Sequence, residues 1–468
     1  MTKPEIGLIL LRAEWFDAVV QLPELTEAVQ EDARQIHLAL ENDLCIRHVW
    51  VINSAAALAA CVEALKTADC DLFVLCFQVW AEDYYLNPLL DALNRRPLMV
   101  WCYQPQTHPP LPAQFLDVLR FSGAVGVFEG MGTLRNLGVD YTFTFGSPQD
   151  GRPAREILAV ASAARVLRLL RSARFGLLPA RNEQMQSTFV DEFRLRRDLG
   201  PQVEYLSVGE LARAAANIDP QAAARFADDL RGQCVIEDVE DAALLLAAKT
   251  ALGMAALTEE RRLDVLSLND ISPELHEVLG LRPCLYPPVL AKQGRLWGLE
   301  GDLGAAAALF VLHQLTLAPC MFVEFWFWDE TENWLVGGHA GVQNPAAAGD
   351  GRVSITRDYE FAQADASPGA HYQFVAAPGP VTLLQLRCTP DGWQAIAAAG
   401  ESLAGGPWLE GYPHAAVRLE AGVESFLRQC ATVGTTQHWI LARGIVLAKL
   451  EILFRMLQIP CQTIYRSV

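Results

Sequence analysis

Positive charge is scarce in this chain of 468 residues, which carries 37 lysines and arginines against 55 aspartates and glutamates. The formal net charge is −18 at pH 7. A surface this acidic repels nucleic-acid phosphates and anionic lipid headgroups. The composition therefore predicts neither a nucleic-acid partner nor a membrane partner, and it favours a small substrate that is neutral or bound with the help of a cation.

Long apolar runs and closely paired cysteines are also missing. No run reaches the roughly 18 residues of a membrane span without a charge or a turn residue. The first apolar run is interrupted by Arg12 and Glu14 and lacks a small-residue cleavage site, so we expect a strand there rather than a signal peptide. The 11 cysteines include no CxxC pair. This usage predicts reduced thiols and a cytoplasmic protein.

Strands and helices alternate through the first two thirds of the chain. Apolar strands at 6–11, 71–77 and 97–103 are separated by helical segments, which is typical of a parallel, doubly wound sheet. A long helix at 152–172 leads to a strand at 175–178, after which the same alternation recurs. The sequence therefore predicts two Rossmann-like α/β domains.

The last third of the chain has a different character. After Gly341 glycine, proline and aspartate become frequent, and short strands such as 381–386 and 414–419 are separated by turns. We therefore expect an α/β fold with two doubly wound α/β domains, followed by a C-terminal domain that contains an antiparallel β-barrel. The predicted domain ranges are 1–165, 166–318 and 319–468.

The strongest chemical signals lie close together in the sequence. Glu300 ends a short apolar run, and Asp302 can cap the Ala- and Leu-rich helix that follows. Glu324 lies in an aromatic strand with two apolar faces, so we expect its carboxylate to be buried and either protonated, paired or metal-bound. His339 stands between glycines, which allow close approach of a ligand. The ordinary alternative is a core glutamate bonded to the backbone and a structural histidine.

This stretch resembles the metal-binding core of the L-fucose isomerase and L-arabinose isomerase family. The shared motifs are E-G-D at 300–302, a carboxylate at Glu324, D-E-x-E-N at 329–333 and G-H-x-G at 338–341. In that family two carboxylates and a C-terminal histidine hold a divalent metal, usually Mn²⁺, and arabinose isomerases add the histidine of the G-H motif. The resemblance implies a metal site made of Glu300, Glu324, His438 and His339. It also implies that Glu300 and Glu324 are catalytic and shuttle a proton.

The resemblance further implies aldose–ketose isomerisation of a free pentose or deoxyhexose through an enediol. It implies a homo-oligomer, a trimer or hexamer, in which the first domain of one subunit covers the metal site of another. The residues expected to bind the sugar are Gln78, Trp80, Gln104, His414 and Trp439. Two alternatives stay open: a non-catalytic sugar-binding protein with two α/β lobes, and a fold relative with a metal but a different sugar chemistry.

The sequence departs from the family pattern in two places. The second carboxylate is Glu324, as in arabinose isomerases, where fucose-type relatives have Asp. The G-H motif continues with Ala340 where the family often has Cys. The motif therefore does not determine which sugar is used.

Overall fold

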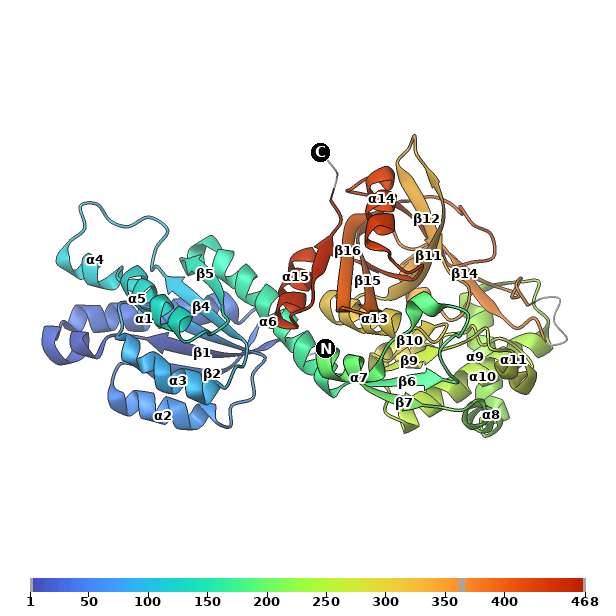
Figure 1. Ribbon diagram of the computed structural model, residues 1–468, viewed down its shortest axis with the longest axis horizontal. Coiled ribbons are helices and arrows are strands. Elements are labelled where there is room, and N and C mark those ends of the chain that lie inside the picture. The colour runs from blue at the N-terminus through green and yellow to red at the C-terminus, as the bar shows by residue number, and fades with distance from the viewer. Residues whose placement is uncertain (1–2, 362–366, 466–468) are drawn as a thin grey trace. The chain divides into compact units, whose positions relative to one another are not determined.

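The computed structural model of the protein describes residues 3–361 and 367–465 (Figure 1). The chain divides between Arg168 and Leu169 into two compact units. The first unit holds one parallel sheet, and the second holds another parallel sheet together with the barrel strands. The further division of the second unit at residue 318 stays a prediction.

The first unit is built on a parallel sheet with strand order β2-β1-β3-β4-β5. Both faces of the central strands are buried: Ile9 lies in one core cluster, while Leu8 and Leu10 on the opposite face are equally buried. Burial of both faces explains why these strands read as continuous apolar runs. The elements are β1 (Glu5–Leu11), α1 (Pro23–Leu40), β2 (Cys45–Ile52), α2 (Ala55–Leu65), β3 (Leu72–Phe77), α3 (Leu86–Leu93), β4 (Leu98–Tyr103), α4 (Phe115–Arg120), α5 (Gly123–Asn136), β5 (Thr142–Gly146) and α6 (Arg152–Ser172).

The second parallel sheet repeats the order of the first four strands, as β10-β9-β6-β7. In each sheet the second strand joins one side of the first strand and the third joins the other side, so the order reverses between β1 and β3 and again between β6 and β9. Ligands bind at the carboxyl ends of strands at such a reversal. The elements are β6 (Arg174–Leu178), α7 (Glu192–Arg194), β7 (Gln202–Tyr205), α8 (Val208–Ala216), α9 (Pro220–Gln233), α10 (Asp241–Glu260), β9 (Val265–Leu268), α11 (Pro273–Leu279), α12 (Pro288–Gln293) and β10 (Leu296–Leu299).

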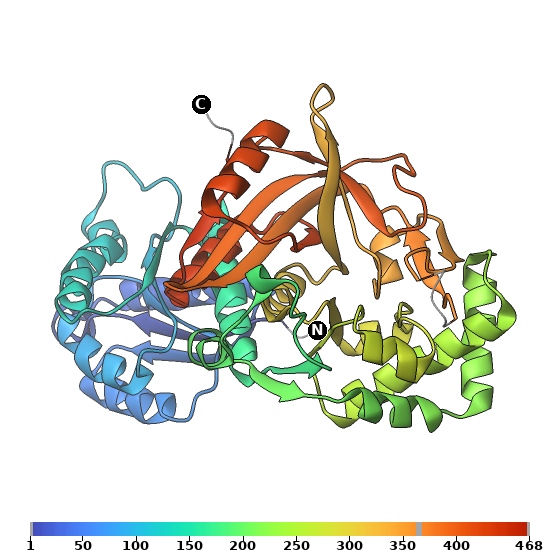
Figure 2. The same cartoon turned by 45° about the vertical axis from the view of Figure 1, so that its right-hand side comes forward.

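Six antiparallel strands close into a barrel in the order β15-β18-β11-β12-β17-β16, since β16 pairs back onto β15 (Figure 2). The prediction of two parallel α/β sheets followed by an antiparallel barrel is confirmed. The elements are β11 (Cys320–Asp329), β12 (Trp334–Gly338), β15 (Gly379–Thr389), β16 (Gly392–Ser402), β17 (His414–Leu419), α14 (Val423–Val433), β18 (Trp439–Arg443), α15 (Leu447–Met456) and β19 (Cys461–Thr463), with a small sheet of β8 (Val235–Glu237), β13 (Val353–Thr356) and β14 (His371–Phe374).

Helix α13 (Leu303–Thr316) joins the second sheet to the barrel. One side of the helix packs on β9 and β10, and another side packs on β15 and β18. A helix covered all round has no polar face, which accounts for its Ala- and Leu-rich sequence. Its N-terminal end, with Glu300 and Asp302, is thereby held where the sheet meets the barrel.

Helix α10 is long and apolar enough to cross a membrane, but most of it is buried inside the second unit, as in the core helix of a globular domain. All the cysteines of the chain are free thiols. The cytoplasmic localisation stays a prediction.

Candidate metal centre

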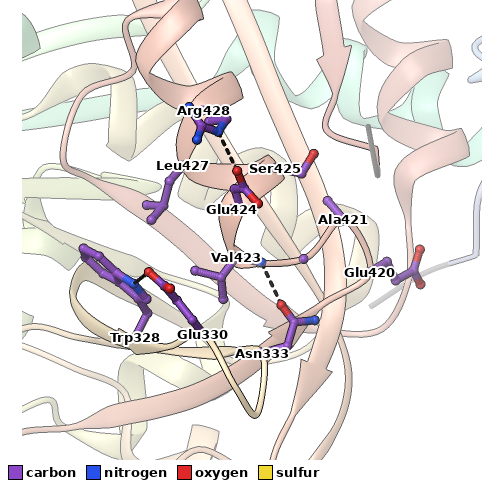
Figure 3. A pocket seen from close by; sticks show the side chains of 11 residues that line it. Trp328, Glu330, Asn333, Glu420, Ala421, Val423, Glu424, Ser425, Leu427 and Arg428 are labelled. Atoms are coloured by element: carbon purple, nitrogen blue, oxygen red, sulfur yellow. Dashed lines mark hydrogen bonds and ion pairs between the residues drawn. The ribbon is translucent and has the colours of Figure 1, made fainter. Parts of the chain in front are cut away.

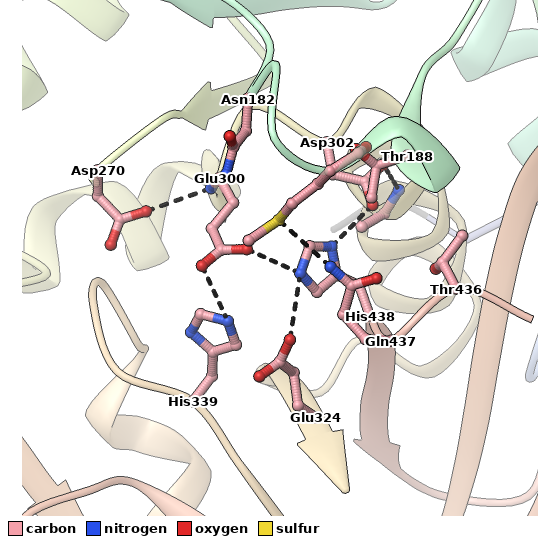
Figure 4. A network of polar contacts seen from close by, with 12 residues as sticks. Asn182, Thr188, Asp270, Glu300, Asp302, Glu324, His339, Thr436, Gln437 and His438 are labelled. Carbon is pink, nitrogen blue, oxygen red and sulfur yellow. Dashed lines mark hydrogen bonds and ion pairs between the residues drawn. The ribbon is translucent and has the colours of Figure 1, made fainter. Parts of the chain in front are cut away.

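Four predicted ligands meet at the end of the second parallel sheet that faces the barrel (Figure 4). Glu300 follows β10, Glu324 lies in β11, His339 follows β12 and His438 precedes β18. Each residue offers one ligand atom, and these atoms all lie within 4.8 Å of one another. The parallel sheet thus supplies one carboxylate, and the barrel supplies the other carboxylate and both imidazoles.

An unusual backbone turn places Glu300. Its φ is +56° and that of Gly301 is +67°, so two consecutive residues adopt the left-handed conformation. A Cβ on Gly301 would lie 2.6 Å from the carbonyl oxygen of Ala180, which is why glycine is required here. The carboxylate of Asp270 accepts a hydrogen bond from the backbone N–H of Glu300 at 3.2 Å. Such strained backbone at a non-glycine residue is typical of functional sites.

Asp302 contacts both the N-terminus of α13 and His438. One carboxylate oxygen of Asp302 accepts a hydrogen bond from the N–H of Ala305, which caps α13, and the other lies 2.9 Å from Nδ1 of His438. Nε2 of His438 then faces Glu300, at 2.9 Å. A carboxylate that holds one ring nitrogen fixes the tautomer and leaves the other nitrogen for a metal. The sequence predicted the capping role of Asp302 but not its contact with His438.

The charges in the cluster set its protonation. Burial acts to lower the pKa of His438, but hydrogen bonds and charges from Asp302 and Glu300 outweigh it and raise this pKa to about 10. Burial acts to raise the pKa of Glu300, yet His438 and His339 hold it below its ordinary value. Without a cation, His438 is therefore an imidazolium between two carboxylates. A divalent cation and the proton on Nε2 compete for the same place.

His339 faces the cluster from the barrel. Its Nδ1 lies 2.7 Å from the carbonyl oxygen of Ala340, so Nδ1 carries the proton in the neutral ring and Nε2 faces Glu300 at 3.6 Å. The ring of Phe322 packs against both histidines, with centroid distances of 5.1 Å to His339 and 4.6 Å to His438. The aromatic ring confines both imidazoles to the positions that converge on Glu300.

The prediction that Glu324 is buried is wrong. Its side chain is 27% exposed, and one of its oxygens lies 3.6 Å from Nε2 of His438. Glu324 pairs regularly with Gly338, and the register of β11 against β12 shifts only after it, between Phe325 and Phe327. From Trp326 to Trp328 the strand is exposed, so Glu324 lies where the buried part of β11 ends. An accessible carboxylate is better placed than a buried one to meet a substrate.

The donor set fits a divalent cation. Two carboxylates and two imidazoles offer oxygen and nitrogen atoms, which suit Mn²⁺ and similar ions, whereas a thiolate-rich set would favour zinc. Because the side chain of Glu324 is partly exposed, further oxygen ligands can approach a bound cation from that side. The chemistry of the four residues therefore agrees with the predicted cofactor, although it does not distinguish Mn²⁺ from its neighbours.

Two predicted sugar-binding residues of the second unit are not brought to the cluster. His414 has Nδ1 2.7 Å from the carbonyl oxygen of Tyr412, and its Nε2 accepts the N–H groups of Trp408 and Leu409. Trp439 is buried and packs against Phe325 of β11 and Phe426 of α14. The ring nitrogens of His414 are thus occupied by backbone groups, and the ring of Trp439 is packed between β11 and α14.

The other three predicted sugar-binding residues belong to the first unit. Gln78 is buried and accepts a hydrogen bond from Nε of Arg12 at 2.8 Å. The indole N–H of Trp80 donates to Glu129, and the amide of Gln104 donates to the carbonyl oxygen of Gln106. Their role in covering the site of another subunit stays a prediction.

A buried ionic group behind Glu300 was not predicted. Arg282 makes two hydrogen bonds to Asp358, at 2.6 and 2.7 Å, one to Glu360 at 2.6 Å, and lies 3.7 Å from Asp270. Burial raises the pKa of Asp270 to about 6. The only signal in the sequence is that Asp270 closely follows an apolar strand, at the edge where parallel sheets bind ligands.

A separate cleft opens between the β11–β12 hairpin and α14 (Figure 3). Its polar side chains are already paired with one another: Glu424 with Arg428, Asn333 with the N–H of Val423, and Trp328 with Glu330. None of the four clustered ligands lines it. This cleft is therefore not a candidate for the chemistry.

Comparisons with known proteins point to sugar isomerases. No family model matches the chain. Proteins named sulfoquinovose isomerase from Priestia aryabhattai and Priestia megaterium are each 20% identical to it over 415 residues, which cover 87% of this chain and 89% of each relative. One from Alkalicoccus urumqiensis is 20% identical over 386 residues, covering 81% of this chain and 83% of the relative. These relatives support a sugar isomerase family, while the specific resemblance to L-fucose and L-arabinose isomerases stays a prediction.

One solved structure has a weak likeness to the chain. A crystal structure of an ABC transporter periplasmic solute binding protein from Actinobacillus succinogenes with bound D-allose is 14% identical, and the match covers 67% of this chain and 92% of that chain. Its TM-score is 0.15, too low for the likeness to bear on fold or function.

Proposed function

We propose that this protein is a divalent-metal-dependent aldose–ketose isomerase that acts on a free sugar in its open-chain form. The observation that carries the proposal is the convergence of two carboxylates and two imidazoles within 4.8 Å. The relatives named sulfoquinovose isomerase support the same reaction class independently. The residues that would hold the metal, preferably Mn²⁺, are Glu300, Glu324, His339 and His438.

The residues suit the proton transfers of this reaction. Moving hydrogen between C1 and C2 requires a base at one carbon, an acid at an oxygen and stabilisation of the enediolate charge. A divalent ion, when bound, supplies that stabilisation as a Lewis acid. Glu324 is partly exposed and is proposed to carry the proton between C2 and C1. Glu300, whose lowered pKa leaves it ionised before the reaction, is proposed to carry the other proton between the sugar oxygens O2 and O1.

Two substrate classes follow from different observations. The motif resemblance favours a pentose or deoxyhexose. The names of the relatives favour sulfoquinovose, a hexose that carries a sulfonate group. We propose that the remaining contacts to the sugar come from Gln78, Trp80 and Gln104 of another subunit, so that the protein works as a homo-oligomer, a trimer or hexamer. We also propose that it is cytoplasmic.

The test is a screen of free sugars with Mn²⁺ added, read by interconversion. The panel contains sulfoquinovose, L-fucose, L-arabinose and their ketoses. We expect conversion of at least one, and product formed in deuterated water should carry deuterium at the carbon that received the proton. Sugar and metal binding without interconversion of any sugar would instead support a non-catalytic sugar-binding protein.

A further inference from the structure

Asn182 has a buried amide nitrogen at the edge of the cluster that finds no hydrogen-bond partner among the described residues. It lies in the loop after β6, at the point where the order of the second sheet reverses, and its side chain is 4% exposed. Its Nδ2 group makes no hydrogen bond within the described part of the chain. A buried donor left without an acceptor costs about 1–3 kcal/mol, so each such group in a native structure requires an explanation.

The loop is pressed directly onto the Glu300 turn. A Cβ on Gly301 would lie 3.2 Å from the backbone nitrogen of Asn182, so the two segments touch. Figure 4 shows the Asn182 amide beside Glu300, with its nitrogen toward that residue. Asn182 therefore approaches the cluster from the parallel sheet, as Asp270 does from the neighbouring strand.

The orientation of the amide is determined by its own loop. The side-chain oxygen of Asn182 accepts a hydrogen bond from the N–H of Gln184 at 3.0 Å, so the nitrogen cannot take that position. The carboxylate oxygens of Glu300 are already engaged by His438 and His339. The Nδ2 donor of Asn182 is thus fixed and directed toward the site, while the carboxylate of Glu300 is paired with His438 and His339.

A buried carboxylate lies at the same edge. Oδ2 of Asp270 makes no hydrogen bond in the described residues but lies 3.7 Å from the guanidinium of Arg282, and the other oxygen accepts the backbone N–H of Glu300. Asp270 is thus engaged from two sides, whereas Nδ2 of Asn182 is left open to an oxygen atom of a ligand.

We propose that Asn182 binds the substrate by donating its Nδ2–H to an oxygen of the open-chain sugar held at the cluster. The inference rests on the proposed function and adds a specific polar contact to it. A neutral amide recognises a hydroxyl or carbonyl oxygen of any sugar and makes no demand for a charged substituent. Asn182 is then a binding residue for the sugar and not a metal ligand.

The test removes the Nδ2 donor but keeps the acceptor that orders the loop: Asn182→Asp leaves no donor, and Asn182→Ser leaves only a hydroxyl on a shorter side chain. Asn182→Ser and Asn182→Asp both leave an oxygen for the N–H of Gln184. Asn333→Asp is the matched control, because Asn333 also uses its oxygen to accept a backbone N–H, that of Val423 at 2.9 Å, far along the hairpin. Mn²⁺ affinity and the melting temperature are measured first, and sugar binding is then titrated calorimetrically with D-glucitol and L-arabinitol as open-chain probes.

We expect Asn182→Ser to bind the probe that the parent binds about 10-fold more weakly, with parental Mn²⁺ affinity. Asn182→Asp should lose more, and Asn333→Asp should match the parent. Parental probe affinity in Asn182→Ser, or no binding of either probe to the Mn²⁺-loaded parent, would overturn the inference. Failure of the proposed function is a separate result, in which the parent binds a probe but interconverts no sugar.

Discussion

The two parallel sheets share a strand order but use their carboxyl edges differently. In the first unit, Arg12 and Gln78 follow β1 and β3 and hydrogen-bond to each other at 2.8 Å, and Arg12 also donates to the carbonyl oxygen of Val29 in α1. In the second unit, Asn182 follows β6 and keeps its buried Nδ2 group unpaired within the described ranges. Asp270 follows β9 and faces Arg282 at 3.7 Å and the backbone N–H of Glu300 at 3.2 Å.

The difference shows that topology supplies the place for a site but not the site itself. At the first edge, Arg12 and Gln78 are hydrogen-bonded to each other and to α1, and this pairing stabilises the unit. The second edge leaves the amide nitrogen of Asn182 open and adds a strained carboxylate, Glu300, opposite the imidazoles of the barrel. Substitutions at the two edges should therefore change different quantities.

The largest effect is expected from the two carboxylates of the second unit. At saturating Mn²⁺, Glu300→Gln and Glu324→Gln should each lower kcat by on the order of 10²-fold or more, because glutamine keeps an oxygen ligand but removes the base. Steady-state kinetics on the sugar that the parent converts measures this. Glu332→Gln, at an exposed carboxylate of the neighbouring hairpin, should leave kcat unchanged. Parental kcat in either variant would refute the proton shuttle while leaving a metal site possible.

The next effect concerns the carboxylate that orients His438. Asp302→Asn keeps an oxygen for the cap of α13 but weakens the hold on Nδ1, so Mn²⁺ affinity should fall by about 10- to 100-fold. Asp219→Asn makes the same change at the N-terminus of α9, where the carboxylate caps the helix and otherwise faces only the exposed Arg225 at 3.6 Å, and it should bind Mn²⁺ as the parent does. Calorimetric titration distinguishes the two. Equal affinities would mean that Asp302 only caps the helix.

Asp32 in the first unit should affect stability and not metal binding. Asp32 is buried and accepts two hydrogen bonds from Arg120, at 2.6 and 3.0 Å, so Asp32→Asn should lower the free energy of unfolding by about 2 kcal/mol. Urea unfolding measures the loss, and Mn²⁺ affinity should not change. Glu31→Gln, which removes an exposed pair with Arg34, should cost less than about 0.5 kcal/mol. A loss of Mn²⁺ affinity in Asp32→Asn would show that the two edges are not independent.

The smallest effect is expected at Trp439. Its ring packs against Phe325 of β11 and Phe426 of α14, so Trp439→Phe should lower the free energy of unfolding by about 1 kcal/mol and leave KM unchanged. Thermal unfolding and kinetics are the measurements. A KM raised 10-fold or more would restore the sugar-binding role that the sequence predicted.

The layers of the fold could be predicted because they follow from local patterns. Strands such as β3 are apolar on both faces, which indicates a parallel sheet under helices, and the turn-rich segment after Gly341 indicates antiparallel strands. Residues 300 and 438 are far apart in the chain, so no periodicity could bring Glu300 and His438 together. Their pairing was predicted from a family resemblance.

Details that depend on tertiary contacts could not be predicted from the sequence. The apolar residues on both faces of β11 predicted a buried Glu324, but its side chain is 27% exposed, because the segment from Trp326 to Trp328 that follows it is itself exposed. The sequence predicted that Asp302 caps α13, but it gave no indication of the contact between Asp302 and His438. Asn182 is distinguished by a buried Nδ2 group that has no hydrogen-bond partner in the described residues, and this property exists only in the folded chain.

The most direct test of the account is the metal content of the protein. Protein purified without chelator and reloaded with Mn²⁺ should hold roughly one ion per chain, and His438→Gln and Glu324→Gln should each lose most of it. His37→Gln, at an exposed histidine of α1 in the first unit, should keep the parental content. Parental metal content in both His438→Gln and Glu324→Gln, with melting temperatures like that of the parent, would contradict the central claim that the edge of the second sheet and the barrel together form a metal site.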